Sequence, residues 1–301
     1  MECALTLIVG QESPNSPLKI NINGMIMAMM FSPDGKHLSS THDGVQVWQV
    51  EDGKQIATME ARNVWCLAVS QHGRWIAAGT NNGDVYVWDA ETREQVWSHK
   101  EDSSPVCAVD FSLDSTRLVT GSDNKKATTW DMATRKQVHT LEHEHWVRAT
   151  KYSGQGDRLA TGTRTFVRIW DNDGRLLVTI NVGVEPCFNT GLLWSNNHLF
   201  ALSDGQIKHF EASMTSAGSE WPIPDGNSTS CIALPKHKKF IAYSTNCTVT
   251  YWDTTTHSQC GLIEHTQNIW SIAISPDDQS LAIGGWGGNI IIRNLVSFVY
   301  C

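Results

Sequence analysis

The 301-residue sequence lacks any apolar run of the roughly 18 to 20 residues that a membrane-spanning helix needs. Its first residues, MECALTLIVGQES, include a short apolar stretch but neither the basic segment nor the small-residue cleavage site of a secretory signal. We therefore expect a cytoplasmic protein with no membrane partner.

Positive charge is also scarce, since 23 Lys and Arg face 31 Asp and Glu, for a formal net charge of -8. A protein that binds nucleic acid presents a basic surface to the phosphates. The sequence therefore indicates that nucleic acid is not a partner.

Paired cysteines are missing. The eight cysteines are scattered, and none forms the CxxC pair of a zinc knuckle or a thioredoxin-type redox site. Without a secretory signal, we expect all eight to be reduced thiols.

Motifs that would carry catalysis are absent as well. The sequence has no GxSxG and no HExxH. GGWGG (284–288) is rich in glycine, but it lies between two predicted strands, whereas a phosphate-binding loop leads into a helix. EHEHW (142–146) could suggest a metal site from His143 and His145, although alternate residues of an extended segment point to opposite faces. We expect no catalytic residue, no metal and no cofactor.

What the sequence does contain is a repeat. Short strand-like segments such as DVYVWDA recur with an aromatic residue near their end, every 40 to 42 residues along the chain. The recurring positions are Trp48, Trp88, Trp130, Trp170, Phe210, Trp252 and, without an aromatic residue, Arg293. The spacing predicts seven repeat units.

A second marker defines each unit more closely. FSPDGKHL (31–38) matches VSQHGRWI (69–76), FSLDSTRL (111–118), YSGQGDRL (152–159) and ISPDDQSL (274–281), each an apolar residue, a polar turn and a second apolar residue. The alternation of apolar residues and the turn residues between them predict antiparallel hairpins and no helices. Each unit therefore holds four strands.

These residues resemble the WD-repeat family over nearly the whole chain, about 18–301. The Trp-Asp pair itself stands at 88–89, 130–131, 170–171 and 252–253. The resemblance implies an all-β, seven-bladed β-propeller in which each blade has four antiparallel strands. We expect one propeller domain over residues 18–301, preceded by an N-terminal extension over residues 1–17.

The hydrogen-bonded strut that the family builds from a His, a Ser or Thr, an Asp and the strand Trp is eroded here. Only His143 and His265 fit the histidine position, and the turn Asp is replaced by Asn82, Asn124 and Asn246 in three units. The third unit, with Thr120, Asn124 and Trp130, comes closest to a complete set. We expect buried aromatic and aliphatic side chains to contribute more stability than the struts.

The last unit lacks its outer strand, because the chain ends where that strand should begin. The spacing of the first unit places an extra strand at 18–22, and we predict that it pairs with the third strand of the seventh unit and closes the ring. The alternative is that SFVYC (297–301) forms a short outer strand and LTLIV (5–9) packs elsewhere.

In this family the usual partner-binding surface, here called the top face, is formed by the loops that enter each innermost strand and by the turns between the second and third strands. The register of the repeat places seven aromatic, cationic or methionine residues on this face: Met25, Met27, Trp65, Trp146, Arg148, Trp270 and Trp286. Trp and Arg are enriched at the energetic centres of interfaces. Trp286 is the most informative, since a large aromatic residue has no local structural role in a glycine-flanked turn. For Trp65, Trp146 and Trp270, packing between blades is an equal alternative.

The resemblance and the top-face residues favour a non-catalytic scaffold that binds a protein or peptide, acting either as a monomer or as a domain of a larger chain. The alternative is a receptor for a small ligand, with tryptophans stacking on a sugar or surrounding a methylated cation beside Asp123 or Asp43. A propeller enzyme is the third and weakest hypothesis.

Overall fold

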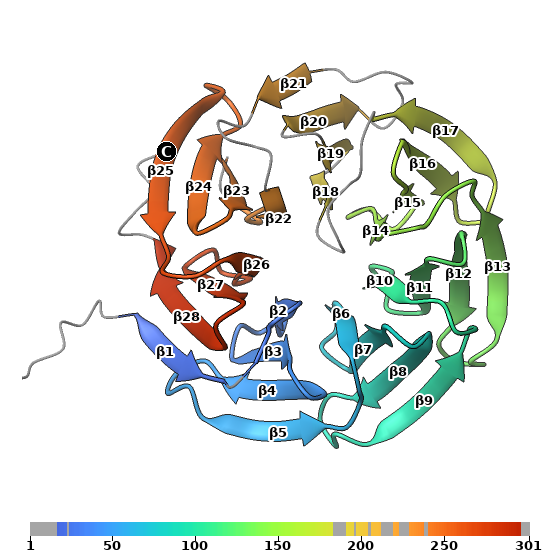
Figure 1. Ribbon diagram of the computed structural model, residues 1–301. Helices are drawn as coiled ribbons and strands as arrows, with labels where there is room; N and C mark the ends of the chain where they lie inside the picture. Colours follow the sequence, from blue (N-terminus) through green and yellow to red (C-terminus); the bar gives the residue numbers. More distant parts are fainter. Residues whose placement is uncertain are drawn as a thin grey trace, which may run out of the picture.

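The structure is a computed structural model that describes residues 17–22, 24–182, 191–195, 197–203, 206–211, 219–222, 229–237 and 240–295. Its strands form seven antiparallel sheets of four strands each, arranged as a ring around a central axis (Figure 1). The prediction of an all-β, seven-bladed propeller is therefore confirmed.

The first four blades follow the chain order from the axis outward. Blade 1 consists of β2 (Met29–Phe31), β3 (His37–Thr41), β4 (Val45–Gln49) and β5 (Gln55–Met59). Blade 2 consists of β6 (Val64–Val69), β7 (Trp75–Thr80), β8 (Asp84–Asp89) and β9 (Gln95–Lys100). Blade 3 consists of β10 (Val106–Phe111), β11 (Arg117–Ser122), β12 (Lys126–Asp131) and β13 (Gln137–Glu142). Blade 4 consists of β14 (Ala149–Tyr152), β15 (Arg158–Gly162), β16 (Phe166–Asp171) and β17 (Leu176–Asn181).

The remaining blades include the one shared by both ends of the ring. Blade 5 consists of β18 (Leu192–Ser195), β19 (His198–Ser203), β20 (Gln206–Glu211) and β21 (Ser219–Pro222). Blade 6 consists of β22 (Thr229–Ala233), β23 (Phe240–Thr245), β24 (Thr248–Asp253) and β25 (Ser258–Glu264). Blade 7 consists of β26 (Ile269–Ile274), β27 (Ser280–Gly285), β28 (Asn289–Asn294) and β1 (Leu18–Asn21).

The recurring serine of the second sequence marker closes the turn between the first two strands of a blade. In blade 1 the Ser32 hydroxyl donates to Asp34 at 2.5 Å and accepts the His37 amide at 2.9 Å, and Gly35 adopts a left-handed φ of 71°. Ser112 with Asp114 and Ser275 with Asp277 repeat this arrangement. The second sequence marker is thus a turn whose polar side chains form hydrogen bonds with each other and with the backbone of the same turn.

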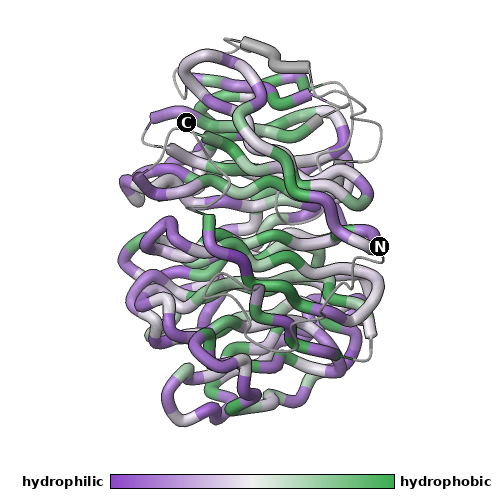
Figure 2. Tube along the Cα trace, turned by 90° about the vertical axis from the view of Figure 1, so that its left-hand side faces the viewer, coloured by the Kyte–Doolittle hydropathy of each residue, from purple (hydrophilic) through white to green (hydrophobic). Residues whose placement is uncertain are grey.

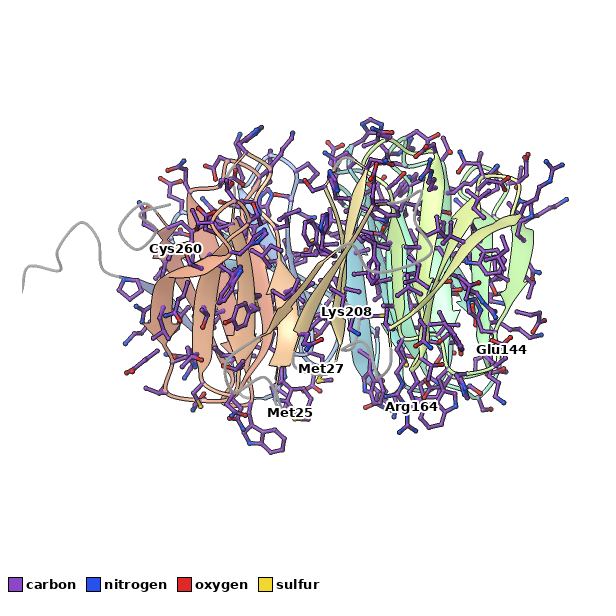
Figure 3. All side chains as sticks on the ribbon, turned by 90° about the horizontal axis from the view of Figure 1, so that it is seen from above. Met25, Met27, Glu144, Arg164, Lys208 and Cys260 are labelled. Carbon is purple, nitrogen blue, oxygen red and sulfur yellow. The ribbon has the colours of Figure 1, made fainter. Side chains whose placement is uncertain are left out.

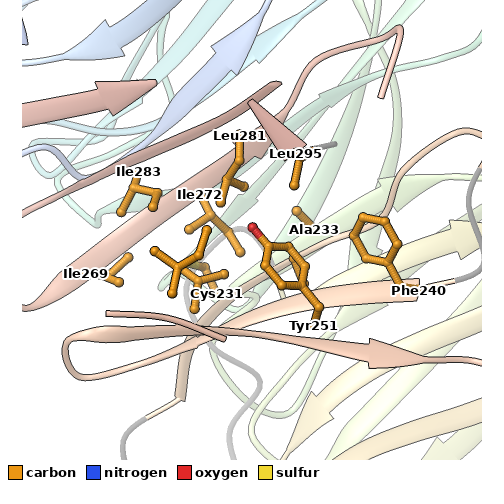
Figure 4. Packing of buried hydrophobic residues seen from close by; sticks show 12 residues of the cluster. Cys231, Ala233, Phe240, Tyr251, Ile269, Ile272, Leu281, Ile283 and Leu295 are labelled. Atoms are coloured by element: carbon orange, nitrogen blue, oxygen red, sulfur yellow. The ribbon is translucent and has the colours of Figure 1, made fainter. Parts of the chain in front are cut away.

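The core lies between neighbouring sheets. Hydrophobic side chains follow the strands, and hydrophilic residues gather at the turns on both faces of the ring (Figure 2). Figure 4 shows the cluster between blades 6 and 7, where the Phe240 and Tyr251 rings meet edge to face with centroids 5.3 Å apart. Because each cluster draws on two blades, each blade depends on its neighbour for burial of its apolar surface.

The ring is closed by the N-terminal strand, as predicted. β1 pairs antiparallel with β28, with Leu18 opposite Ile292 and Ile20 opposite Ile290. The Ile20 and Ile22 side chains are buried in the cluster shared by blades 7 and 1. The rival strand, SFVYC, and residues 1–16 of the expected extension lie outside the described residues.

Struts occur in three of the blades that the structure describes. The Trp48 indole donates to Ser40 at 2.9 Å in blade 1. In blade 4 the Trp170 indole donates to the Thr161 hydroxyl at 2.8 Å, and that hydroxyl is also 2.8 Å from His143 Nε2. Burial lowers the pKa of His143 to about 4, so this ring is neutral at physiological pH.

In blade 3 a glutamate stands where the histidine is expected. The Trp130 indole donates to Thr120 at 3.2 Å, the Thr120 hydroxyl donates to Glu101, and the Asn124 amide lies 3.4 Å from the same carboxylate. Burial raises the pKa of the Glu101 carboxyl, and the hydrogen bond from Thr120 opposes this shift. The third blade therefore has a complete strut of changed chemistry.

Replacing Thr161 by Val tests what such a strut contributes. Val keeps the volume but leaves the Trp170 indole and the His143 ring without their partner, at about 1–3 kcal/mol per buried unsatisfied group. We expect Thr161→Val to lower the free energy of unfolding by roughly 2–4 kcal/mol in urea titrations. Thr161→Ser retains the hydroxyl and is the control; equal losses in the two variants would show that the hydroxyl is dispensable.

The expectation of eight reduced thiols is wrong for Cys260, which is disulfide-bonded. The other cysteines that the structure describes, Cys66, Cys107, Cys231 and Cys247, are thiols outside any disulfide. Within the described ranges, no helix has the length and apolarity needed to cross a bilayer.

Candidate partner-binding face

The loops entering the innermost strands and the turns between second and third strands open on one side of the ring. Figure 3 shows this for Met25, before β2, and Arg164, in the turn between β15 and β16, which both lie along the lower edge of that view. Met27 lies slightly further inside. This side is the top face defined from the sequence.

Trp270 and Trp286 form an aromatic pair on blade 7. Their ring centroids are 5.9 Å apart and their planes are inclined by 50°. The Trp286 side chain is 60% exposed, whereas Trp270 is partly buried beneath it. The Trp286 amide donates to the Asn268 carbonyl at 3.0 Å, so the turn that carries Trp286 is tied to the loop that precedes Trp270.

A β-bulge positions the Trp270 ring. The pairing of β26 with β27 shifts register between Ile269 and Ser271, so Trp270 is an extra residue in the strand. Such a bulge re-aims a side chain out of the regular alternation. The strand pairing shifts register in the same way at Trp65 in β6 and at Cys107 in β10. The bulge is therefore a recurring device that turns one residue of the innermost strand toward the top face.

A second group joins blades 3 and 4. The Arg148 guanidinium lies 4.6 Å from the centroid of the Trp146 ring and binds both oxygens of Asp123, at 3.3 and 3.4 Å. The side chains of Arg148 and Asp123 are only 16% and 15% exposed, while Trp146 is 47% exposed. Arg148 is therefore a support for Trp146, and its charge is already balanced.

Cys107 completes the surroundings of Asp123. Its thiol lies 3.3 Å from the carboxylate. Burial, followed by the Asp123 charge, raises the pKa of the Cys107 thiol. The group is thus held in its protonated, unreactive form.

The predicted site residues include two pairs whose side chains are in contact. Trp270 contacts Trp286 on blade 7, and Trp146 contacts Arg148 on blade 4. Met25, 46% exposed, and Met27 precede β2 of blade 1, which packs against blade 7 through the contact of β2 with β26. Trp65 is partly buried on blade 2. The sequence placed these residues on one face but did not indicate which of them touch.

Two sequence features suggested other chemistry. The His143 ring is engaged by Thr161 and by the Leu141 carbonyl at 2.9 Å, which supports its structural role over metal binding. Within the part of the chain that the structure describes, no group of three or more His, Cys, Asp or Glu is arranged to hold a metal. GGWGG joins β27 to β28 as a hairpin turn, without a helix to bind a phosphate.

The sequence reasoning missed the bulges and the pairing of Arg148 with Asp123. A signal for the bulges is present, since VWCLAV and IWSIAI carry a tryptophan directly after the first apolar residue of the strand. The ion pair leaves no such local signal, because its residues are 25 positions apart and belong to different blades.

Comparison with known proteins agrees with this architecture. The family model for the WD domain, G-beta repeat matches residues 53–89, 93–131, 135–171 and 257–294, together about half of the chain. The unmatched stretches include blade 5 and the three inner strands of blade 6, whereas β25, the outer strand of blade 6, falls within the last match.

Curated relatives are distant. The chain is 25% identical over 281 residues to the guanine nucleotide-binding protein subunit beta of Schizosaccharomyces pombe, covering 87% of this chain and 90% of that protein. It is 25% identical over 187 residues to Protein FIZZY-RELATED 3 of Arabidopsis thaliana, covering 58% of this chain and 38% of that protein. A third match, to the WD repeat and SOCS box-containing protein 1 of Mus musculus, is 35% identical over 65 residues, 21% of this chain and 15% of that protein.

The matched segment thus spans nearly all of the guanine nucleotide-binding protein subunit beta, but only about two fifths of Protein FIZZY-RELATED 3 and less than a fifth of the WD repeat and SOCS box-containing protein 1. Four family matches, seven blades and a ring closed by the N-terminal strand point to one conclusion. The chain belongs to the WD40 repeat family of β-propellers.

Proposed function

We propose that this propeller is a non-catalytic scaffold that binds a protein or peptide on its top face, centred on Trp270 and Trp286. The observation that carries the proposal is the 60% exposure of Trp286 on a turn held against Trp270. An exposed tryptophan that gains little burial from its own fold has apolar surface left to bury against a partner.

The surroundings of the pair favour binding. The bulge at Trp270 and the hydrogen bond of Trp286 to Asn268 hold both rings, so a partner would order few side chains on contact. Exposed Met25 on neighbouring blade 1 adds an adaptable apolar side chain. Trp146, supported by Arg148, offers a second aromatic contact on blade 4. A partner that contacts both the Trp270–Trp286 pair and Trp146 would have to be as large as a protein. A peptide would bind at the Trp270–Trp286 pair alone.

The comparisons support the same class of function. One relative that aligns over most of both chains is, by its name, the beta subunit of a guanine nucleotide-binding protein. WD40 propellers are typically non-catalytic. The net charge of -8 disfavours nucleic acid as the partner. We place the protein in the cytoplasm, as a monomer or as part of a longer chain.

A small-ligand receptor is the second candidate, favoured by the open angle of 50° between the Trp270 and Trp286 planes. Two inclined rings could form two walls of a cage for a methylated cation. Such a cage also needs a carboxylate. Asp123 is bound by Arg148, while the Asp43 side chain on blade 1 is 94% exposed. The protein-binding function is therefore the better supported.

A Trp270→Ala/Trp286→Ala double variant tests the proposal. Peptides would be selected from a random display library against the intact chain, and their affinities measured for both proteins. We expect the double variant to bind at least about 30-fold more weakly, which corresponds to roughly 2 kcal/mol for the loss of an aromatic hot spot.

Leu177→Ala is the matched control, because Leu177 is 50% exposed on the outermost strand of blade 4. It should leave the affinities unchanged. Selected peptides that bind the double variant as well as the wild type would refute the proposed site. Binding confined to a panel of glycans or methylated peptides, with no response to unmodified peptides, would favour the small-ligand receptor.

A further inference from the structure

Two histidines converge on the surface of blade 5, outside the top face. His198 begins β19 and His209 lies near the end of β20. Nε2 of His209 is 2.9 Å from Nδ1 of His198, and the ring centroids are 4.9 Å apart. The His198 side chain is exposed and the His209 side chain is half-buried.

The register of the two strands adds a carboxylate to the same face. Glu211 is directly opposite His198, and Phe200 is directly opposite His209. Alternate residues of a strand share a face, so all four side chains stand on one surface of the sheet. Directly opposed residues have Cβ atoms about 5 Å apart, within reach of a shared ligand.

The His209 ring is held in place before any ligand arrives. It stacks on Phe200 with centroids 4.9 Å apart and planes inclined by 21°. Burial, and then the neighbouring His198 and His257 rings, lower the pKa of His209. The lowered pKa favours the neutral imidazole, which is the form that binds metals.

We propose that His198 and His209 chelate a divalent transition metal ion such as Zn²⁺, with Glu211 and water completing the coordination. Zinc binds histidine nitrogen at about 2.0–2.1 Å, so a tetrahedral ion would hold the two nitrogens roughly 3.3 Å apart. The observed 2.9 Å requires only a small opening of the pair. The ion would replace the hydrogen bond between the two rings, and the proton of the donating nitrogen would pass to solvent or to the other nitrogen of the same ring.

The site differs from a preformed structural zinc centre. Among the described residues, no set of three or more His, Cys, Asp or Glu is already arranged for a metal. The two histidines therefore supply the initial contacts, and the Glu211 carboxylate turns toward the ion after binding. With open positions left for water, such a site favours exchangeable binding over permanent occupancy.

Isothermal titration calorimetry with zinc chloride tests the proposal, on protein that carries no affinity tag and has been freed of bound metal with a chelator. We expect one saturable equivalent in the wild type. His198→Gln and His209→Gln should each weaken binding at least about tenfold, because each removes one of two imidazole ligands. Glu211→Gln should have a smaller effect, since the amide remains a weak oxygen ligand.

His72→Gln is the control, because His72 is an exposed histidine in a turn of blade 2. Circular dichroism verifies that each variant is folded, and exposed His198 can be replaced without disturbing the core. As a second measurement, zinc should raise the melting temperature of the wild type and of His72→Gln but not of His198→Gln. Absence of saturable binding in the wild type, or equal affinity in His72→Gln and His198→Gln, would overturn the assignment.

Discussion

Ile20→Asp is expected to lower the free energy of unfolding by about 3–5 kcal/mol, because it removes a buried aliphatic side chain and places a charge in a hydrophobic cluster. For a chain of this length that corresponds to a fall in melting temperature of roughly 6 °C. Ile20 is 4% exposed and lies opposite Ile290 in the strand pair that closes the ring.

The position of Ile20 predicts which junction between blades should open first when stability is lost. β1 is the outer strand of blade 7, while the chain that follows it enters blade 1. The Ile26 amide donates to Gly285 at 3.1 Å, and the Met29 amide donates to Ser271 at 2.9 Å. Loosening β1 should therefore open the ring between blades 7 and 1 before the other junctions.

Hydrogen exchange of the folded protein provides the measurement of this opening. In Ile20→Asp, amides of β28 and β2 should lose protection before those of blade 3. Lys19→Asp is the matched control, since the neighbouring Lys19 side chain is exposed. If Ile20→Asp and Lys19→Asp melt at the same temperature, β1 does not hold the ring together.

The sequence predicts those parts of the structure whose residues recur at the same position in the repeat units. Trp48, Trp88, Trp130 and Trp170 recur at the same place in the third strand, and Ser32 with Asp34 marks a turn that returns in other blades. Their spacing was sufficient to place the closing strand at 18–22 and to pair it correctly with β28. A strand or turn pattern that is weak evidence in one segment becomes reliable evidence for the fold when it recurs at a fixed spacing.

The parts that were missed depend on contacts between separate segments of the chain, which the pattern within one strand does not record. Glu101 takes the place of a histidine in blade 3, where the Thr120 hydroxyl donates a hydrogen bond to the carboxylate and accepts one from the Trp130 indole. The disulfide at Cys260 corrects an inference that relied on the missing CxxC pairs and the missing secretory signal. At the candidate site, the contact between Trp270 and Trp286 requires both a bulge and a tight turn. Only the bulge has a repeating sequence signal, the residue after the first apolar position of β6 and β26, and that signal does not say which side chains will touch.

Gly288→Ala is expected to be the second strongly destabilising substitution, at about 2–4 kcal/mol from backbone strain and overpacking together. Gly288 has a left-handed φ of 68°, and a Cβ there would overlap the Ile22 carbonyl oxygen. The Gly288 carbonyl also accepts the Ile22 amide. The glycines of GGWGG thus allow two backbones to approach at the closure of the ring, while Trp286 between them stays exposed.

Gly154→Ala is the matched control, because a Cβ at Gly154 would meet nothing within 4 Å. Thermal melts should show a clear loss for Gly288→Ala and almost none for Gly154→Ala. Combining Gly288→Ala with Ile20→Asp tests whether both act through β1. Once one substitution has loosened β1, the other has less left to disrupt, so their combined cost should be smaller than the sum. Additive costs would mean that the glycine turn and the closing strand stabilise the ring independently.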